Sequence, residues 1–340
     1  MPLDPDRPLD AVLIGRLQRD YLLPFDRPAR VDSLGGALPY AAAGMAMWGG
    51  RAGLVARVNA GYPLEWLERL QDLGCDLRGV KKVEEAIDSR RFIAYSDPLT
   101  PHSENPLTFF AERQLPFPRE LLGYDASRER YCSKTDYQPY SLRVNDVPRA
   151  FLELSAAHIC PVDFISHKIL PSVLKAGLIQ SLTMRASPCY MDPAYWEEMR
   201  ALLSDLTGFM LSEAEALRLY QGRSVDLWEI MEGLAAYGPE FIILSRGDGA
   251  VQVLDRVRKL RALIPAYANR TVDPTGAWDV FDGACLLHYR LNYDPIEGAL
   301  GGQIAASFAI EGSGPYYALD ALEGLKEARL DMLRQRLRLV

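Results

Sequence analysis

In the N-terminal part of the chain, short apolar runs alternate with amphipathic segments. The run Asp10-Ala-Val-Leu-Ile-Gly15 is stopped by glycine and predicts a buried strand, and Gly53-Leu-Val-Ala-Arg57 predicts the next one. Between them, the Ala- and Met-rich segment 37–48 predicts a helix, because both residue types are good helix formers. A second, amphipathic helix is predicted over residues 64–73. This order is typical of a parallel sheet with helices on both faces.

The middle of the chain lacks this regular pattern. Seven prolines lie from Pro98 to Pro148 with few periodic runs, so we expect long connections there, partly a lid over the sheet, rather than a second domain. Regular alternation then returns, and the C-terminal part is almost wholly helical. The predicted strands cover residues 156–160, 177–183, 206–210 and 240–245, and the predicted helices cover 193–203, 212–220, 225–236, 276–291, 294–310 and 318–336.

The length of 340 residues suits one large α/β domain. No internal repeat or low-complexity segment divides the chain. Residues 1–340 are therefore predicted to form a single doubly wound domain, with a mostly parallel sheet and helices on both faces.

Charge and composition exclude several classes of protein. Lys and Arg number 38 against 45 Asp and Glu, a net charge of −7, so no basic surplus is available for nucleic acid. No apolar run approaches the roughly 18 residues that span a bilayer, and the N-terminus lacks the features of a signal peptide. The cysteines are few and scattered, which favours reduced thiols and a cytoplasmic protein over a disulfide framework. They are Cys75, Cys132, Cys160, Cys189 and Cys285.

The most informative segment covers residues 272–284 and reads VDPTGAWDVFDGA. Asp-Pro-Thr-Gly is turn chemistry, and helical spacing follows it. The first N–H groups of a helix have no internal partner, so the amides of residues 276–279 could hold a phosphoryl group. Asp279 could take the proton from a substrate hydroxyl that attacks phosphorus. The same residues are equally consistent with an ordinary turn and an acidic first helical turn.

This segment resembles the C-terminal signature of the ribokinase-like (PfkB) carbohydrate and nucleoside kinases, approximately D-x-T-G-A-G-D-x-F-x-G. The residues in register are Asp273, Thr275, Gly276, Ala277, Asp279, Phe281 and Gly283. Four further elements of that family follow in the right order over nearly the whole chain. They are G-x-x-x-x-D at Gly15 to Asp20, G-G-x-x-x-N at Gly35 to Tyr40, N-x-x-E at Ser212 to Glu215, and T-x-G at Ser245 to Gly247.

The resemblance implies a ribokinase-like fold and ATP-dependent phosphoryl transfer to a hydroxyl of a sugar or sugar-like small molecule. It implies that Asp279 is the general base. The anion hole would be formed by Gly276, Ala277 and Trp278, and the substrate would be held by Asp20, Gly35, Gly36 and Tyr40. The nucleotide would lie along Ser245, Gly247 and Thr275, and Glu215 would act through water on Mg²⁺.

The resemblance also implies a small β lid, formed by residues 16–33 and 86–112, that closes over the substrate and excludes water. It leaves open a monovalent cation near the anion hole and a homodimer formed through the lid. The substrate, the nucleotide donor and the oligomeric state are not determined by the sequence.

Four residues depart from the family pattern. Trp278 replaces the middle glycine of G-A-G-D, and Tyr40 replaces the asparagine of the N-terminal signature. Ser212 replaces the asparagine of N-x-x-E, and Arg185 stands where many relatives carry an acidic residue. These losses motivate an alternative, a ligand-binding relative that transfers no phosphate. A purely structural assembly partner has no positive feature in the sequence.

Other constellations are weaker. His158 and Cys160 share one face of a strand, but two ligands do not make a zinc site, and a core pair is the simpler interpretation. The chain has no G-x-x-x-x-G-K-[ST] motif and no G-x-G-x-x-G after the first strand. A Walker-type phosphate site and a nicotinamide-dependent dehydrogenase are therefore disfavoured.

Overall fold

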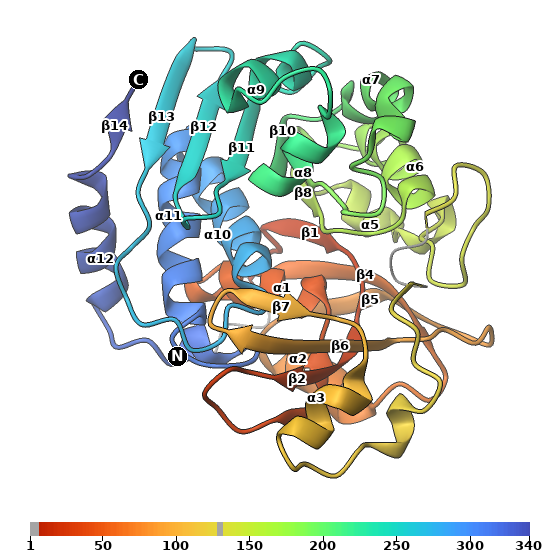
Figure 1. The fold of residues 1–340 in the computed structure, drawn as a ribbon. Coiled ribbons are helices and arrows are strands. Elements are labelled where there is room, and N and C mark those ends of the chain that lie inside the picture. The colour runs from red at the N-terminus through yellow and green to blue at the C-terminus, as the bar shows by residue number, and fades with distance from the viewer. Residues whose placement is uncertain (1–6, 128–131) are drawn as a thin grey trace.

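A large sheet forms the centre of the protein. The computed structural model describes residues 7–127 and 132–340, and Figure 1 shows the sheet with helices packed around it. In spatial order its strands are β14 (Arg338–Leu339), β13 (Leu260–Ile264), β12 (Val251–Asp255), β11 (Phe241–Ser245), β10 (Gly208–Ser212), β9 (Ser181–Arg185), β8 (Ala156–Ile159), β1 (Ala11–Ile14), β4 (Ala52–Asn59) and β5 (Asp76–Val83).

The strands from β11 to β5 are parallel, whereas β12, β13 and β14 pair antiparallel at one edge. Strand β1 shows why a continuous apolar run forms a central strand: all four of its residues are buried. Val12 and Ile14 pack into the core on one face of the sheet, and Ala11 and Leu13 pack into the core on the other. The fold is the mostly parallel, doubly wound α/β class that the sequence predicts.

Two groups of helices bury the two faces of the sheet. One group is α1 (Ala37–Met47), α2 (Leu64–Asp72), α10 (Ala277–Asn292), α11 (Pro295–Ala309) and α12 (Leu325–Arg334). The other is α5 (Arg149–Leu152), α6 (Phe164–Lys175), α7 (Met199–Leu203), α8 (Glu213–Leu219) and α9 (Leu227–Ala235). Short 3-10 turns are η1 (Arg119–Leu121), η2 (Val144–Asp146), η3 (Pro193–Glu198) and η4 (Tyr317–Asp320).

A second, four-stranded sheet lies beside the main body, in the order β3 (Arg30–Gly35), β2 (Gln18–Leu23), β6 (Arg90–Asp97) and β7 (Thr100–His102). One face has its own small core, in which Tyr21 and Phe92 pack against Phe110 of α3 (Pro106–Glu112). Figure 1 shows α3 on the side of this sheet that faces away from α10. The segments 16–33 and 86–112 therefore fold together into one unit, which we call the small sheet.

Several elements differ from the sequence-based prediction. Strand β9 begins at Ser181 rather than Gly177 and extends to Arg185. Helix α6 contains Pro171, which is unusual inside a helix. Strand β5 lies at an edge of the sheet and carries the charged residues Asp76, Arg78, Lys81 and Lys82, so it lacks the apolar run of a buried strand. Strands β12 and β13 are not among the predicted strands, although β12 is fully buried and lies between β11 and β13. The predicted helix 318–336 is a 3-10 turn followed by α12.

One prediction about the cysteines is wrong. Cys132 and Cys189 form a disulfide whose Cα atoms are 5.4 Å apart, whereas Cys75, Cys160 and Cys285 are buried free thiols. The two partners are 57 residues apart in sequence and lie in connections that meet only in the folded chain. Sequence spacing carries no signal for such a pair.

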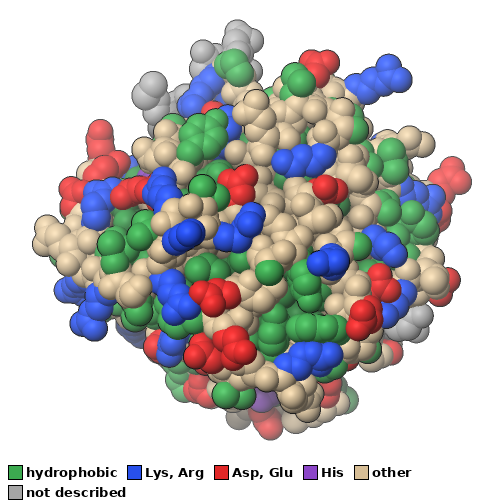
Figure 2. Space-filling model, turned by 90° about the horizontal axis from the view of Figure 1, so that it is seen from above, with side chains coloured by type: hydrophobic (Ala, Val, Ile, Leu, Met, Phe, Trp, Pro, Cys, Tyr) green, Lys and Arg blue, Asp and Glu red, His purple; other side chains and the backbone are tan. Residues whose placement is uncertain are grey.

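Charged side chains of both signs are distributed over the surface. On the face shown in Figure 2, basic and acidic side chains are interspersed rather than collected by sign. Within the described residues, none of the helices combines the length and apolar character that crossing a membrane requires.

Candidate active site

The turn before α10 is held by one buried carboxylate. Asp273 is 1% exposed, and its Oδ1 accepts a hydrogen bond from the amide of Thr275 at 3.0 Å. Its Oδ2 accepts a second bond from the hydroxyl of Ser313 at 2.5 Å. Asp273 therefore braces the Asp-Pro-Thr-Gly turn and fixes where the helix begins.

The first turn of α10 exposes backbone amides. Gly276 has φ 74°, and a Cβ atom there would lie 2.2 Å from the ring of Tyr40, so only glycine fits. The amide of Ala277 donates to the carbonyl of Pro274 at 3.1 Å and is engaged within the turn. Within residues 7–127 and 132–340, the amides of Gly276 and Trp278 make no hydrogen bond. Two of the three amides expected in an anion hole are thus available to an anion.

Asp279 lies in this turn and keeps partial exposure. Desolvation, and then the nearby Asp282 carboxylate, raise the pKa of its carboxyl to about 7 against the opposing effect of Arg91 and Arg185. The carboxyl can therefore take up and release a proton near neutral pH, as a general base requires.

The position expected to read substrate hydroxyls is occupied by an ion pair. Asp20 on β2 is fully buried and accepts hydrogen bonds from Nε and Nη2 of Arg91 on β6, at 2.8 and 2.5 Å. Gly35 makes room for this carboxylate, because a Cβ atom there would lie 1.8 Å from the carboxyl carbon of Asp20. The Tyr40 hydroxyl is buried beside this pair without a hydrogen-bond partner among the described residues. Asp20 is thus bound within the protein, and Arg91 adds a cation that the sequence analysis did not predict.

A second buried ion pair lies at the C-terminal end of β9. Nη2 of Arg185 donates to Oδ1 of Asp282 at 2.6 Å, and Nε contacts the other carboxylate oxygen. His158 approaches the same carboxylate at 3.6 Å and bonds to the hydroxyl of Thr183 at 2.9 Å. Burial lowers the pKa of His158 to about 3, so this imidazole is neutral and Arg185 is the counterion of Asp282. His158 is a partnered core residue, in agreement with the simpler interpretation.

The residues expected near the nucleotide already have partners. Ser245 is buried and donates to the carbonyl of Leu211 at 3.3 Å, and the amide of Gly247 donates to Glu213 at 3.0 Å. The hydroxyl of Thr275 bonds to Tyr95 of β6 at 3.0 Å. The amide of Gly247 and the hydroxyl of Thr275 could exchange these partners for a ligand, whereas Ser245 is directed into the sheet.

Glu215 forms a capping box with Ser212 at the start of α8. Its Oε2 accepts bonds from the amide and the hydroxyl of Ser212, at 2.7 and 2.8 Å, which leaves Oε1 for another partner. No group of three metal-ligating side chains occurs in the described part of the chain. One carboxylate oxygen suits Mg²⁺ that keeps its waters and is bound mainly by phosphates of a nucleotide.

The structure brings Gly35 against Asp20, and Tyr40 against Gly276 at the start of α10. Sequence analysis did not identify Arg91, Tyr95 or Asp282 at this site. Asp282 could have been found, because it lies three residues after Asp279 on the same helix. Arg91 and Tyr95 could not, since their positions depend on how β6 pairs with β2.

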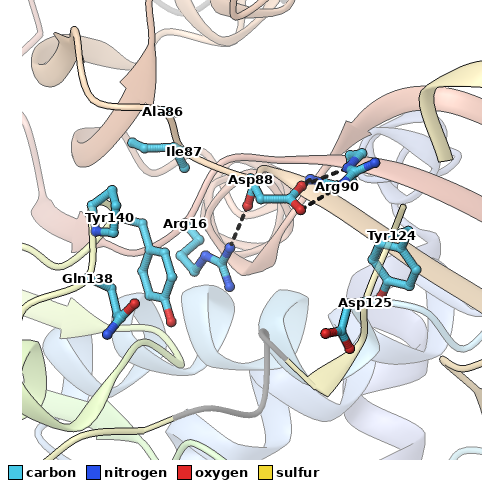
Figure 3. A pocket seen from close by; sticks show the side chains of 10 residues that line it. Arg16, Ala86, Ile87, Asp88, Arg90, Tyr124, Asp125, Gln138 and Tyr140 are labelled. Atoms are coloured by element: carbon cyan, nitrogen blue, oxygen red, sulfur yellow. Dashed lines mark hydrogen bonds and ion pairs between the residues drawn. The ribbon is translucent and has the colours of Figure 1, made fainter. Parts of the chain in front are cut away.

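A pocket of about 320 Å³ lies elsewhere, at the start of β6. Figure 3 shows Arg16 between Tyr140 and Asp88; its guanidinium lies 4.2 Å from the centre of the Tyr140 ring and donates to the carbonyl of Asp88 at 3.4 Å. Asp279 does not line this pocket. This pocket and the candidate chemistry are therefore separate features.

Comparison with known proteins identifies the fold. A cytidine kinase from Thermococcus kodakarensis is 25% identical over 289 residues, which cover 83% of this chain and 88% of that protein. The structure of a ribokinase from Giardia lamblia superposes with a TM-score of 0.69 at 16% identity, covering 97% of this chain and 99% of that one. The chain has the ribokinase fold. The resemblance indicated by the sequence motifs is thus confirmed at the level of the whole chain.

A second solved structure of this fold contains ligands. A putative ribokinase II from E. coli, in complex with ATP and Mg²⁺, has a TM-score of 0.68 at 18% identity and covers 97% of this chain and 100% of that one. No family model matches the chain. The ribokinase fold therefore rests on the structural similarity, and the individual site residues rest on the geometry described above.

Proposed function

We propose that the protein transfers a phosphoryl group from ATP to a hydroxyl of a sugar or nucleoside-like small molecule. The observation that carries this proposal is the carboxylate of Asp279 in the first turn of α10, next to backbone amides that can bind an anion. The raised pKa of Asp279, about 7, suits proton transfer at neutral pH.

In the proposed reaction, Asp279 accepts the proton of the acceptor hydroxyl while that oxygen attacks the γ-phosphorus. The bond from phosphorus to the β,γ-bridging oxygen breaks, and its electrons leave with ADP. The amides of Gly276 and Trp278 bind the oxygens of the transferred group, at the positive end of the dipole of α10. The small sheet acts as the lid, which keeps water from competing with the acceptor.

The proposed cofactor is MgATP. Oε1 of Glu215 would hold Mg²⁺ through water together with the nucleotide phosphates, and the ion would supply charge neutralisation. The cytidine kinase similarity makes nucleosides the first acceptors to test, followed by free sugars. Because Arg91 binds the Asp20 carboxylate, we expect the acceptor to be recognised by this ion pair rather than by a free carboxylate.

The test is single-turnover phosphate transfer from ATP to a panel of nucleosides and sugars. Asp279→Asn is expected to lower the rate by about 10²–10⁴-fold, since it removes the proton acceptor but keeps the size of the side chain. Asp205→Asn, at an exposed position after α7, is the matched control and is expected to retain full activity. Equal rates in Asp279→Asn and in the unmodified protein would refute the role of Asp279.

A non-catalytic, ligand-binding protein is the second candidate, favoured by the occupied Asp20 carboxylate and by Trp278 beside Asp279. Calorimetric titration with MgATP separates the two. Nucleotide binding together with transfer to an acceptor on the panel supports the kinase. Acceptor binding without any affinity for MgATP supports the alternative.

A further inference from the structure

The C-terminal end of β9 carries a buried cation to which the proposed reaction has so far given no role. Arg185 is the last residue of β9 and is 6% exposed. Its Nε and Nη2 atoms are both bonded to the carboxylate of Asp282. Among the residues that the structure describes, the third nitrogen, Nη1, has no hydrogen-bond partner, and it is not one of the nitrogens sealed in the core. The guanidinium is thus fixed through two nitrogens and retains donors for a further partner.

Arg185 lies between the two groups that the proposed reaction uses. Its register partner on β10 is Met210, two residues before Ser212, which begins the capping box of Glu215. Its guanidinium carbon lies 5.9 Å from the centre of the Trp278 ring, next to Asp279 in the chain. Ligands of open α/β sheets bind at the carboxyl ends of the parallel strands, which is where Arg185 lies on β9.

The carboxylates around Asp279 would repel an incoming phosphoryl group. A cation that arrives with the ligand, or one that belongs to the protein, must offset this repulsion. Asp279, Asp282 and Glu215 all act electrostatically on Arg185. Burial alone would lower the pKa of Arg185, but these carboxylates raise it, so the guanidinium stays charged. A phosphoryl group that approaches Asp279 meets two carboxylates on α10, and Arg185 is the buried cation beside them that can offset their repulsion.

We propose that Arg185 is a catalytic residue that binds the transferred phosphoryl group through Nη1, and that Asp282 is a positioning residue that holds the guanidinium. This inference rests on the proposed function. As the acceptor oxygen attacks and ADP leaves, negative charge spreads over the three outer oxygens of the phosphoryl group, and Nη1 donates a hydrogen bond to one of them. Asp279 takes the proton, and Arg185 remains protonated throughout.

The competing explanation is a structural ion pair that ties β9 to α10. A structural pair predicts loss of stability without a specific effect on phosphate transfer, because breaking a buried pair leaves a buried charge unpaired. Arg57 offers a matched control, since its side chain is similarly buried and paired with Asp146 at 3.5 Å and Glu85 at 2.8 Å. None of these three residues is part of the candidate site.

The experiment compares Arg185→Met, Arg185→Lys and Arg57→Met in the full chain. Steady-state kinetics give kcat and the acceptor KM, and calorimetry gives the affinities for a non-hydrolysable ATP analogue and for ADP. For Arg185→Met we expect kcat to fall at least 100-fold while the acceptor KM changes less than about 3-fold. The preference for the triphosphate analogue over ADP is expected to fall about 10-fold, and Arg185→Lys is expected to restore part of it.

The proposal is overturned if Arg185→Met behaves as Arg57→Met does, with lower thermal stability but unchanged kcat and unchanged nucleotide preference. Should Arg185→Met fail to fold, Arg185→Lys decides: a 10-fold or greater loss of kcat in a folded variant supports the proposal, and an unchanged kcat overturns it. Failure of the proposed function is measured separately, as the absence of phosphate transfer by the unmodified protein. The calorimetric preference for the triphosphate analogue over ADP, and its dependence on Arg185, can still be measured in that case.

Discussion

At the scale of single residues, the proton affinity of Asp279 follows first from its desolvation and then from the carboxylate that shares its helix face. Asp279 and Asp282 lie three residues apart on α10 and repel each other when both are ionised. Asp282 has Arg185 as its ion-pair partner. Asp279 has no comparable ion pair in the described residues, so its ionised form is less stabilised. Asp279 therefore gains and loses its proton near neutral pH, and its ionised form is the one able to accept the hydrogen of a substrate hydroxyl.

The pH dependence of activity tests this assignment. Because Asp279 must be ionised to act as a base and has a pKa of about 7, kcat/KM is expected to rise with pH and to level off above about 8. Removing the repulsion in Asp282→Asn is expected to shift the inflection to lower pH. A profile that is flat from pH 5 to 8 would contradict the assignment of Asp279 as the base.

The same titration affects stability with a definite sign. The pKa of Asp279 rises from the ordinary value of 3.8 to about 7 on folding, so the folded chain binds a proton that the unfolded chain has lost between these values. The stabilisation is complete below about pH 4 and disappears as the pH rises through 7. At pH 8, Asp279→Asn is expected to be about 1–3 kcal/mol more stable to unfolding by denaturant than the unmodified chain. At pH 4 the two are expected to be nearly equal.

Whether the role of a site residue could be predicted depends on how far it lies in sequence from the residues that it contacts. The turn from Asp273 to Asp279 is local, so its motif predicts both the helix start and the exposed amides. The pairing of Asp20 with Arg91 spans 71 residues, and it changes what Asp20 can bind. No local pattern contains that information, because a register shift of one residue would place Arg91 on the opposite face of the small sheet.

At the scale of elements, the start of α10 is positioned by close contact with α1. A Cβ atom at Gly283 would lie 1.8 Å from the carbonyl oxygen of Ala41, and one at Gly44 would lie 2.0 Å from the carbonyl oxygen of Val280. The two helices therefore touch backbone to backbone, with one glycine contributed by each. This contact explains why the last glycine of the motif is needed although it is remote from the anion site.

Gly283→Ala tests this contact. The added methyl group forces the helices apart, and we expect a loss of about 2–4 kcal/mol in the free energy of unfolding, together with reduced activity. Gly61→Ala is the matched control, because the nearest atom to its Cβ lies 3.9 Å away, and it is expected to change stability by less than about 0.5 kcal/mol. Equal stabilities of the two variants in denaturant titrations would contradict the proposed role of the contact.

Elements with strong periodicity were predictable and the others were not. The buried strands β1, β4 and β11 and the helices α1, α2, α10 and α11 follow runs of one pattern. Helix α6 and strand β5 are fixed by tertiary packing, which overrides an internal proline in one and four charged residues in the other. The same holds for β12 and β13, whose pairing depends on the neighbouring strand rather than on their own composition.

At the scale of the whole molecule, the small sheet is joined to the main body at the candidate site. Tyr95 on β6 bonds through its hydroxyl to Thr275, and both side chains are at most 6% exposed. This bond links the proposed lid directly to the turn that starts α10. A lid that must admit a substrate has to break it or move with the turn, so its strength contributes to the balance between open and closed forms.

Tyr95→Phe is expected to shift this balance toward the open form, because it removes one oxygen and leaves the ring in place. Amide hydrogen exchange is expected to become faster in β2 and β6 and to stay unchanged in β8 to β11, since only the small sheet is released. The acceptor KM is expected to rise about 3–10-fold, with a smaller change in kcat. Tyr237→Phe, at a partly buried position against the core on the other face of the main sheet, is the control for loss of a phenol oxygen. Faster exchange throughout the main sheet in Tyr95→Phe would show instead that the bond supports the fold as a whole, and the small sheet would then not act as a separate lid.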